Sequence, residues 1–113
     1  MNVKTVYLFK KHRVSAKTVE KHRPIALKIR RYPRVYSENP TTGFFEDTEL
    51  WMLYVIGKGG KEIYWWEERR PFHMVRFRVL QIVTALQIAR DRIAYEDLTD
   101  SDDVALEDFL NVI

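Results

Sequence analysis

Two apolar runs on either side of a glycine-rich turn limit how the middle of this chain can fold. Residues 50–56 are apolar at every position, so an extended strand there is apolar on both of its faces. Residues 62–66, Glu-Ile-Tyr-Trp-Trp, supply a partner of matching length. Between them, Gly-Lys-Gly-Gly-Lys at 57–61 offers the glycines that a hairpin loop with positive φ angles needs. The pattern predicts a β-hairpin whose first strand is central and covered on both faces.

A helical period replaces the strand pattern after Pro71. From Phe72 to about Tyr95, apolar side chains recur every three or four residues and form one stripe. Proline fits at the preceding position, because the first turn of a helix does not need the missing N–H. We therefore predict one helix over residues 72–95, about 36 Å long at a rise of ~1.5 Å per residue. Its second face carries further apolar residues, which predict contact with the C-terminal helix or with a second subunit.

Strands are also predicted before the hairpin, and a short helix near the C-terminus. Residues 3–9 are rich in β-branched and aromatic side chains, and residues 25–31 alternate between apolar positions and small or basic ones. The segment 14–23 has no strong period, so either Ser15 caps a short helix there or the segment is a loop. The Thr and Asp residues at 99–103 have the composition of a helix N-terminus, and an amphipathic spacing follows them.

These elements predict a single α+β domain over residues 1–113. Its expected architecture is a four-stranded antiparallel sheet packed by one long helix, plus a short C-terminal helix, in the order ββββαα. A chain of 113 residues that is 46% apolar can bury a core, and without cysteine it has no disulfides or thiol ligands. No apolar run approaches the ~20 residues of a membrane span, and the N-terminus lacks the pattern of a secretory signal. We therefore expect a cytoplasmic protein that contacts no membrane.

Charge is distributed unevenly along the chain. Residues 1–36 carry eleven Lys and Arg against one acid, Glu20. Residues 37–90 carry seven charges of each sign, and residues 91–113 carry eight acids against Arg92 alone. Two arrangements are open. In the first, the basic half forms an exposed face for an anionic partner. In the second, the two ends of the chain lie together and neutralise each other.

The first functional hypothesis is a small non-enzymatic protein that binds single-stranded DNA, RNA or another polyanion, such as an acidic protein surface. Cations that follow phosphates, interleaved with rings that stack on bases, are typical of such surfaces. Alternation in the predicted strand 25–31 puts Lys28 and Arg30 on one exposed side. The alternative is a solvated basic face without this role. The residues assigned to the interface are Lys10, Lys11, Arg13, Lys28, Arg30, Arg31, Tyr32, Arg34, Lys58 and Lys61.

The second hypothesis is an inhibitor or adaptor that binds a protein. Phages and mobile elements encode small proteins of this kind, which act on a host protein complex. Aromatic residues dominate interface hot spots, and this chain has more of them than one sheet face hides. The residues assigned to a protein interface are Trp51, Trp65, Trp66, Phe77, Leu80 and Ile88. The last three belong to the predicted long helix, so a homodimer through that helix is one form of this interface. The alternative is that other parts of the same chain cover these residues.

The third hypothesis is a metal-independent ribonuclease, although no motif assigns any residue to catalysis. Such enzymes use His, Arg, Lys and Tyr around the cleaved phosphate. The chain offers these groups as His12, Arg13, Lys28, Arg30 and Tyr32. The histidines lack metal-ligand spacing, and the turn 57–61 is no Walker loop because a strand rather than a helix follows it. We therefore predict no metal and no cofactor, and we favour the two hypotheses without catalysis while the ribonuclease stays open as the third.

Overall fold

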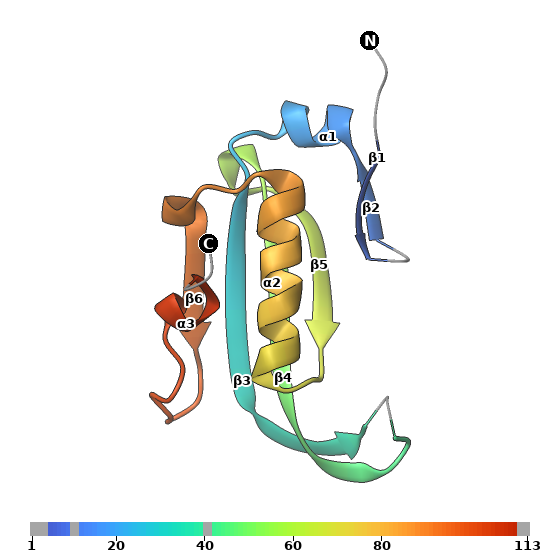
Figure 1. Ribbon diagram of the computed structural model, residues 1–113, viewed down its shortest axis with the longest axis vertical. Helices are drawn as coiled ribbons and strands as arrows, with labels where there is room; N and C mark the ends of the chain where they lie inside the picture. Colours follow the sequence, from blue (N-terminus) through green and yellow to red (C-terminus); the bar gives the residue numbers. More distant parts are fainter. Residues whose placement is uncertain (1–4, 10–11, 40–41, 111–113) are drawn as a thin grey trace.

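The computed structural model describes residues 5–9, 12–39 and 42–110, with side chains from Ser15 onward except that of Trp66. Over these residues the fold is α+β: a mixed four-stranded sheet carries the longest of three helices on one face, and a separate two-stranded hairpin precedes it (Figure 1). The elements in chain order are β1 (Thr5–Phe9), β2 (His12–Ser15), α1 (Ala16–Lys21), β3 (Ala26–Glu38), β4 (Phe45–Ile56), η1 (Lys58–Gly60), β5 (Glu62–Glu68), α2 (Phe72–Leu86), η2 (Arg90–Arg92), β6 (Ile93–Asp97) and α3 (Leu106–Leu110).

The strand order of the main sheet is β5-β4-β3-β6. β3 pairs antiparallel with β4, and β4 pairs antiparallel with β5, which confirms the predicted hairpin. β6 pairs parallel with β3, so the prediction of an entirely antiparallel sheet is wrong at this edge. The parallel pair follows from the crossover, because α2 runs back over the sheet and the chain re-enters it beside β3 (Figure 1).

The helix α2 ends at Leu86, so the prediction of a helix that continues to about Tyr95 is wrong. Gln87 adopts a left-handed conformation with φ 54°, and its N–H caps the Thr84 carbonyl. The chain then passes through η2 into β6, where Ile93 is buried. Ile93 lies seven residues after Leu86 and so continues the helical stripe, which is why periodicity alone did not show that the helix had ended.

The core lies between α2 and the sheet. Val75, Val79 and Ile82 of α2 are fully buried against β3 and β4. Phe109 of α3 is equally buried, and its ring centroid lies 5.8 Å from that of Trp51. The apolar side of the C-terminal helix is therefore part of the core, as its amphipathic spacing predicted. The buried strand residues that face α2 include Leu27, Ile29, Leu53 and Val55.

The start of the C-terminal helix differs from the prediction. Residues 98–105 form a loop, and α3 begins only at Leu106. Asp108 Oδ2 accepts the Ala105 N–H at 2.7 Å, so the acid that caps this helix lies inside its first turn. Thr99 instead donates to Asp97 of β6, and Asp103 accepts from Ser101 and from Arg31 of β3. Short polar side chains serve a loop as readily as a helix end.

The N-terminal predictions agree with the structure only in part, because the predicted first strand lies outside the main sheet and pairs with β2, a strand that the sequence did not predict. β1 confirms the first strand, although residues 3 and 4 lie outside the described part of the chain. Of the two alternatives for 14–23, the short helix is correct, since the Ser15 hydroxyl accepts the Thr18 N–H at 3.1 Å. None of the described helices has the length and apolar character to cross a membrane.

The turn of the β4–β5 hairpin packs against the end of α1. The Lys58 N–H donates to the His22 carbonyl at 2.7 Å. Gly57 is required at this contact, because a Cβ there would lie 2.7 Å from both His22 Cβ and Ile63 Cδ1. This close approach places the hairpin turn beside the short helix.

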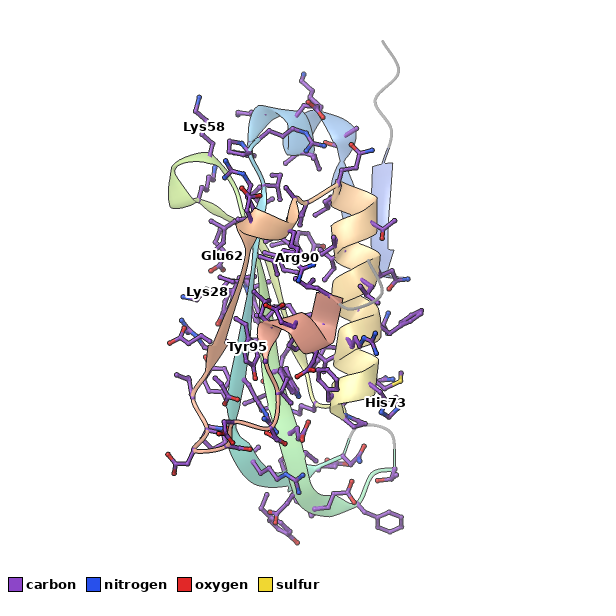
Figure 2. All side chains as sticks on the ribbon, turned by 60° about the vertical axis from the view of Figure 1, so that its left-hand side comes forward. Lys28, Lys58, Glu62, His73, Arg90 and Tyr95 are labelled. Atoms are coloured by element: carbon purple, nitrogen blue, oxygen red, sulfur yellow. The ribbon has the colours of Figure 1, made fainter. Side chains whose placement is uncertain are left out.

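α2 covers one face of the main sheet, and no element of the described chain covers the other (Figures 1 and 2). The prediction that residues 50–56 are covered on both faces is therefore wrong, and the alternate residues of this run are only half-buried. We call the uncovered side the open face. Its residues, by strand register, are Ala26, Lys28, Arg30 and Tyr32 of β3, Leu50, Met52, Tyr54 and Ile56 of β4, Trp65 and Glu67 of β5, and Ala94 and Glu96 of β6.

Candidate functional site

Arg31 lies on the covered face and has only 7% of its surface exposed. Alternation along β3 continues from the apolar core residues to this position, so its side chain points to the α2 side. Its guanidinium nitrogens lie 2.7 Å from Asp103 Oδ1, 3.4 Å from Asp97 Oδ2 and 3.4 Å from Glu49 Oε1. Its Cζ also lies 5.3 Å from the Trp51 ring centroid. The hydrogen bond from Arg31 lowers the pKa of Asp103 to about 2.

Glu96 of β6 forms ion pairs with Lys28 and Arg30, the two cations at the centre of the open face. The parallel register places Glu96 opposite Arg30. Its Oε2 lies 3.1 Å from Arg30 Nε and 3.4 Å from Lys28 Nζ. The hydrogen bond from Arg30 is the main cause of the lowered pKa of Glu96. One carboxylate shared by two cations leaves one positive charge in excess at this point.

Along β3 the structure therefore has the second of the two charge arrangements, in which the two ends of the chain lie together and neutralise each other. The neutralising carboxylates come from β6, from the loop after it and from Glu49 of β4, and not from the C-terminal helix itself. In α3, Glu107 pairs instead with Arg90, with 3.1 Å between Nη2 and Oε2. Farther along β3, Arg34 Nη2 lies 3.6 Å from Glu49 Oε1. The basic residues of β3, the part of this half whose side chains the structure describes most fully, consequently form no single uncompensated face.

Aromatic rings lie beside these cations on the open face. Tyr54 and Trp65 are directly opposite each other in the β4–β5 pair. Trp65 is 55% exposed, the largest value for a tryptophan side chain that the structure describes. Arg30 Cζ lies 5.6 Å from the Tyr54 ring centroid, and Arg30 Nη1 donates to the Tyr32 hydroxyl at 3.3 Å. The open face thus joins flat rings with hydrogen-bond donors that carry positive charge.

A shallow hollow of about 260 Å³ lies between these groups. Its walls are Lys28, Arg30, Tyr54, Ile56 and Glu62. Burial raises the pKa of the Tyr54 hydroxyl, so at neutral pH this group is a hydrogen-bond donor and acceptor without charge. A ligand in the hollow would meet one ring, two cations and one carboxylate.

Four exposed lysines gather where α1 meets the hairpin turn, and we call them the lysine end. They are Lys17 and Lys21 of α1 with Lys58 and Lys61 of the turn. The bond between Lys58 N–H and the His22 carbonyl holds the two segments together. Among the described residues, no carboxylate forms an ion pair with any of the four amines. Figure 2 shows Lys58 at one end of the molecule, with Glu62 and Lys28 following on the same side.

At the opposite end, β3 and β4 continue as a two-stranded extension, which we call the aromatic arm (residues 33–39 and 42–48; Figure 1). Three rings on it are largely exposed: Tyr36 at 72%, Phe44 at 73% and Phe45 at 63%. The rings of Tyr36 and Phe45 have their centroids 6.0 Å apart. The arm therefore presents a cluster of rings that the described chain does not cover.

Acidic side chains accompany the rings of the aromatic arm. Glu38, Glu46 and Asp47 are all exposed. Sequence reasoning missed this surface: the strand pattern of 25–31 extends to Tyr36, but the turn residues at 37–45 predicted a loop, and the next strand was predicted only over 50–56. The signal was present in the aromatic pair at 44–45 and the tyrosine at 36, which flank the turn residues between them.

The residues predicted for a nucleic-acid interface have separated into groups. Lys28, Arg30 and Tyr32 lie together on the open face, and Lys58 and Lys61 lie at the lysine end. The assignment of Arg31 to a surface is wrong, because that residue is buried among carboxylates. Arg34 lies at the base of the aromatic arm. Outside the described part lie Lys10, Lys11 and the side chain of Arg13.

The residues predicted for a protein interface have also separated. Trp51 and Ile88 are buried in the core, so their assignment to a surface is wrong. Trp65 is on the open face, and the side chain of Trp66 lies outside the described part. On α2, Phe77 is 59% exposed and Leu80 is half-buried. Ile88 lies beyond the end of α2, so of the three residues assigned to the second face of the helix only Phe77 and Leu80 belong to it.

Comparisons with known proteins supply no family or relative. The chain matches no protein-family model, no curated protein and no solved structure. Within the described residues, no three His, Asp or Glu side chains are placed together so as to hold a metal ion. Function is therefore inferred from the open face, the lysine end and the aromatic arm.

Proposed function

We propose that this protein binds single-stranded nucleic acid without cleaving it. Bases stack on the rings of the open face, and the phosphates that follow them approach the lysine end. Tyr54 and Trp65 side by side on an uncovered sheet, next to Lys28 and Arg30, carry the proposal. Single-stranded ligands expose the flat faces of their bases, and stacking on an aromatic side chain contributes roughly 1–3 kcal/mol per base.

The lysine end supplies what the rings lack. Lys28 and Arg30 share Glu96, so their attraction for phosphate is partly cancelled. The four lysines at the end of the sheet have no such partner among the described residues. Contact of these four amines with four phosphates gives a slope of about −3 for log K against log salt concentration, at ~0.7 per single-strand contact. Binding should therefore depend on salt, but less steeply than the nine basic residues of the predicted interface on one face would require.

Fluorescence anisotropy with labelled dT12 and U12 oligonucleotides tests this proposal. We expect Trp65→Ala to weaken binding about 5- to 150-fold, which is the loss of one stacked base. Phe77→Ala is the matched control, because that ring is similarly exposed but lies on α2, on the other side of the sheet. No binding of either oligonucleotide at ~50 mM salt, or equal losses for the two variants, would overturn the proposal.

The salt dependence tests the lysine end separately. In Lys58→Glu/Lys61→Glu the slope of log K against log salt should fall by about one half, because two of four phosphate contacts are lost. The slope of Trp65→Ala should equal that of the natural protein, since stacking releases no counterions. A slope that is the same in all three proteins would remove the lysine end from the interface.

The ribonuclease hypothesis has less support. Two of its five candidate residues, His12 and Arg13, have side chains outside the described part of the chain. Of the other three, Lys28 and Arg30 already bind Glu96. Labelled U12 should therefore stay intact after prolonged incubation with the protein, as denaturing gel electrophoresis would show.

A further inference from the structure

The aromatic arm has the chemistry of a surface that binds cations. Tyr36, Phe44 and Phe45 present ring faces, which carry the negative part of the aromatic quadrupole. Glu38, Glu46 and Asp47 on the same arm add formal negative charge. Arg34 is the one cation within the described residues of the arm, and it lies 3.6 Å from Glu49. The arm keeps an excess of negative charge, so we place it outside the proposed nucleic-acid surface. Two arms pairing with each other would also bring acid against acid, which is unfavourable.

The complementary surface is at the other end of the same molecule. The lysine end carries Lys17, Lys21, Lys58 and Lys61 without acidic partners among the described residues. Figure 1 shows α1 and the β4–β5 turn at the end opposite to the aromatic arm. Lysine suits an aromatic acidic partner in two ways. Its ammonium group sits over ring faces or beside carboxylates, and its aliphatic stem packs on apolar surface.

We infer that the aromatic arm of one copy docks on the lysine end of a second copy. The two surfaces are different and lie at opposite ends of the molecule, so the contact is heterologous. Each dimer is left with one free arm and one free lysine end. Such contacts extend into short open chains rather than closing into a two-fold dimer. This inference goes beyond the proposed function: it requires neither the open face nor any nucleic acid.

A shared use of the lysine end has a consequence for both activities. Phosphates and the aromatic arm of a second copy would compete for the same four amines. Oligonucleotide binding should therefore separate the copies, and a copy in a chain should bind nucleic acid through its lysine end only after its neighbour's arm has left.

Sedimentation velocity over ~10–200 μM protein at ~20 mM and ~300 mM NaCl tests the inference, since salt screens exposed charges. We expect assemblies whose mean size rises with protein concentration at low salt and monomers at high salt. A protein that is monomeric over the whole range at low salt would overturn the inference, as would a closed dimer that does not grow.

Charge exchange identifies the two surfaces. Glu38→Lys/Asp47→Lys makes the arm basic, and Lys58→Glu/Lys61→Glu makes part of the lysine end acidic. Each variant alone should associate at least fivefold more weakly than the natural protein. An equimolar mixture of the two should associate again, because each then offers an end that fits the other. Absence of this recovery, with both variants folded by circular dichroism, would contradict the pairing.

The rings are tested with a matched pair of variants. Phe44→Ala/Phe45→Ala should weaken self-association at least fivefold and leave dT12 binding unchanged at protein concentrations too low for self-association. Phe77→Ala removes a similarly exposed ring from α2 and should leave self-association unchanged. Trp65→Ala should keep self-association while losing oligonucleotide binding, so failure of this inference and failure of the proposed function give different results. Equal behaviour of the arm variant and Phe77→Ala would overturn the role of the arm.

Discussion

Arg31 lies on the covered face of the main sheet and Arg30 on its open face, although the two residues are adjacent in sequence. Arg31 is buried and touches three carboxylates. Arg30 is half-buried, shares one carboxylate with Lys28 and has a ring beside it. The comparison teaches that the number of basic residues in a segment says little about a binding surface. The face of the strand decides whether a cation holds the fold together or is available to a ligand.

The same contrast separates the aromatic residues of the two faces. Trp51 and Phe109 are fully buried on the covered face, with ring centroids 5.8 Å apart. Trp65 is in the same sheet but is more than half exposed. A buried ring stabilises the fold because its apolar surface is removed from water. An exposed ring contributes to stability only when something covers it. We therefore expect mutations on the covered face to change folding and mutations on the open face to change binding.

The largest expected effect is that of Phe109→Ala. Removal of this fully buried ring leaves a cavity beside Trp51 and Phe72, and should lower the free energy of unfolding by about 3–5 kcal/mol. Trp65→Ala, on the open face, should lower it by about 1 kcal/mol or less. Urea unfolding followed by circular dichroism measures both. Similar losses in the two variants would mean that the open face is covered in the folded protein.

Arg31→Met should have the next largest effect. The substitution leaves Asp97 and Asp103 without their cation and Glu49 with Arg34 alone. Breaking a buried ion pair by removing one partner costs about 3 kcal/mol or more. Arg30→Met is the matched control, and its unfolding midpoint in urea should stay close to that of the natural protein. Equal midpoints for the two variants would show that the carboxylates around Arg31 are hydrated and need no partner.

Acid should lower the stability of the fold by protonating the carboxylates around Arg31 on the covered face. The pKa of Asp103 is about 2 in the folded protein, below the ~3.9 of an unfolded aspartate, and that of Asp97 is also lowered. The unfolded chain therefore takes up protons first as the pH falls. The stabilisation is fully present above about pH 5 and is lost between about pH 4 and 2.

Urea midpoints at several pH values between 7 and 2.5 measure this acid dependence. Arg31→Met should lose less of its remaining stability over the acid range, because Asp103 no longer accepts the hydrogen bond that lowers its pKa. If the natural protein and this variant lose stability in parallel, other carboxylates cause the acid dependence.

The smallest effect on folding, with a gain in binding, is expected for Glu96→Gln. This substitution frees Lys28 and Arg30 from their shared carboxylate, so dT12 should bind severalfold more tightly and with a steeper salt dependence. The urea midpoint should not change measurably, because exposed ion pairs contribute little to stability. Tighter binding is the outcome that separates the open face from a face that is only solvated. Unchanged affinity would place the oligonucleotide elsewhere on the protein.

Local patterns predicted the parts of the fold that local forces decide. Alternation identified the inner half of β3 and put Lys28 and Arg30 outward, and Ser15 was recognised as a helix cap. The same patterns failed at 87–97, where helical and strand spacing both fit the apolar residues. They also failed at Trp51 and Ile88, because aromatic and aliphatic residues are typical of cores and of interfaces alike. The arm was missed because a turn-rich segment hides how far its flanking strands extend.

The sequence by itself determined the hairpin, the capped helix and the strong separation of charge along the chain, since each depends on residues that are close in sequence. Only the tertiary structure decided which charges meet. Arg31 and Asp103 are 72 positions apart, and Arg30 and Glu96 are 66 apart. Their contacts exist because α2 stops at Leu86 and the chain returns as a parallel strand beside β3. An ion pair depends on distance in space, and no pattern along the sequence specifies that distance.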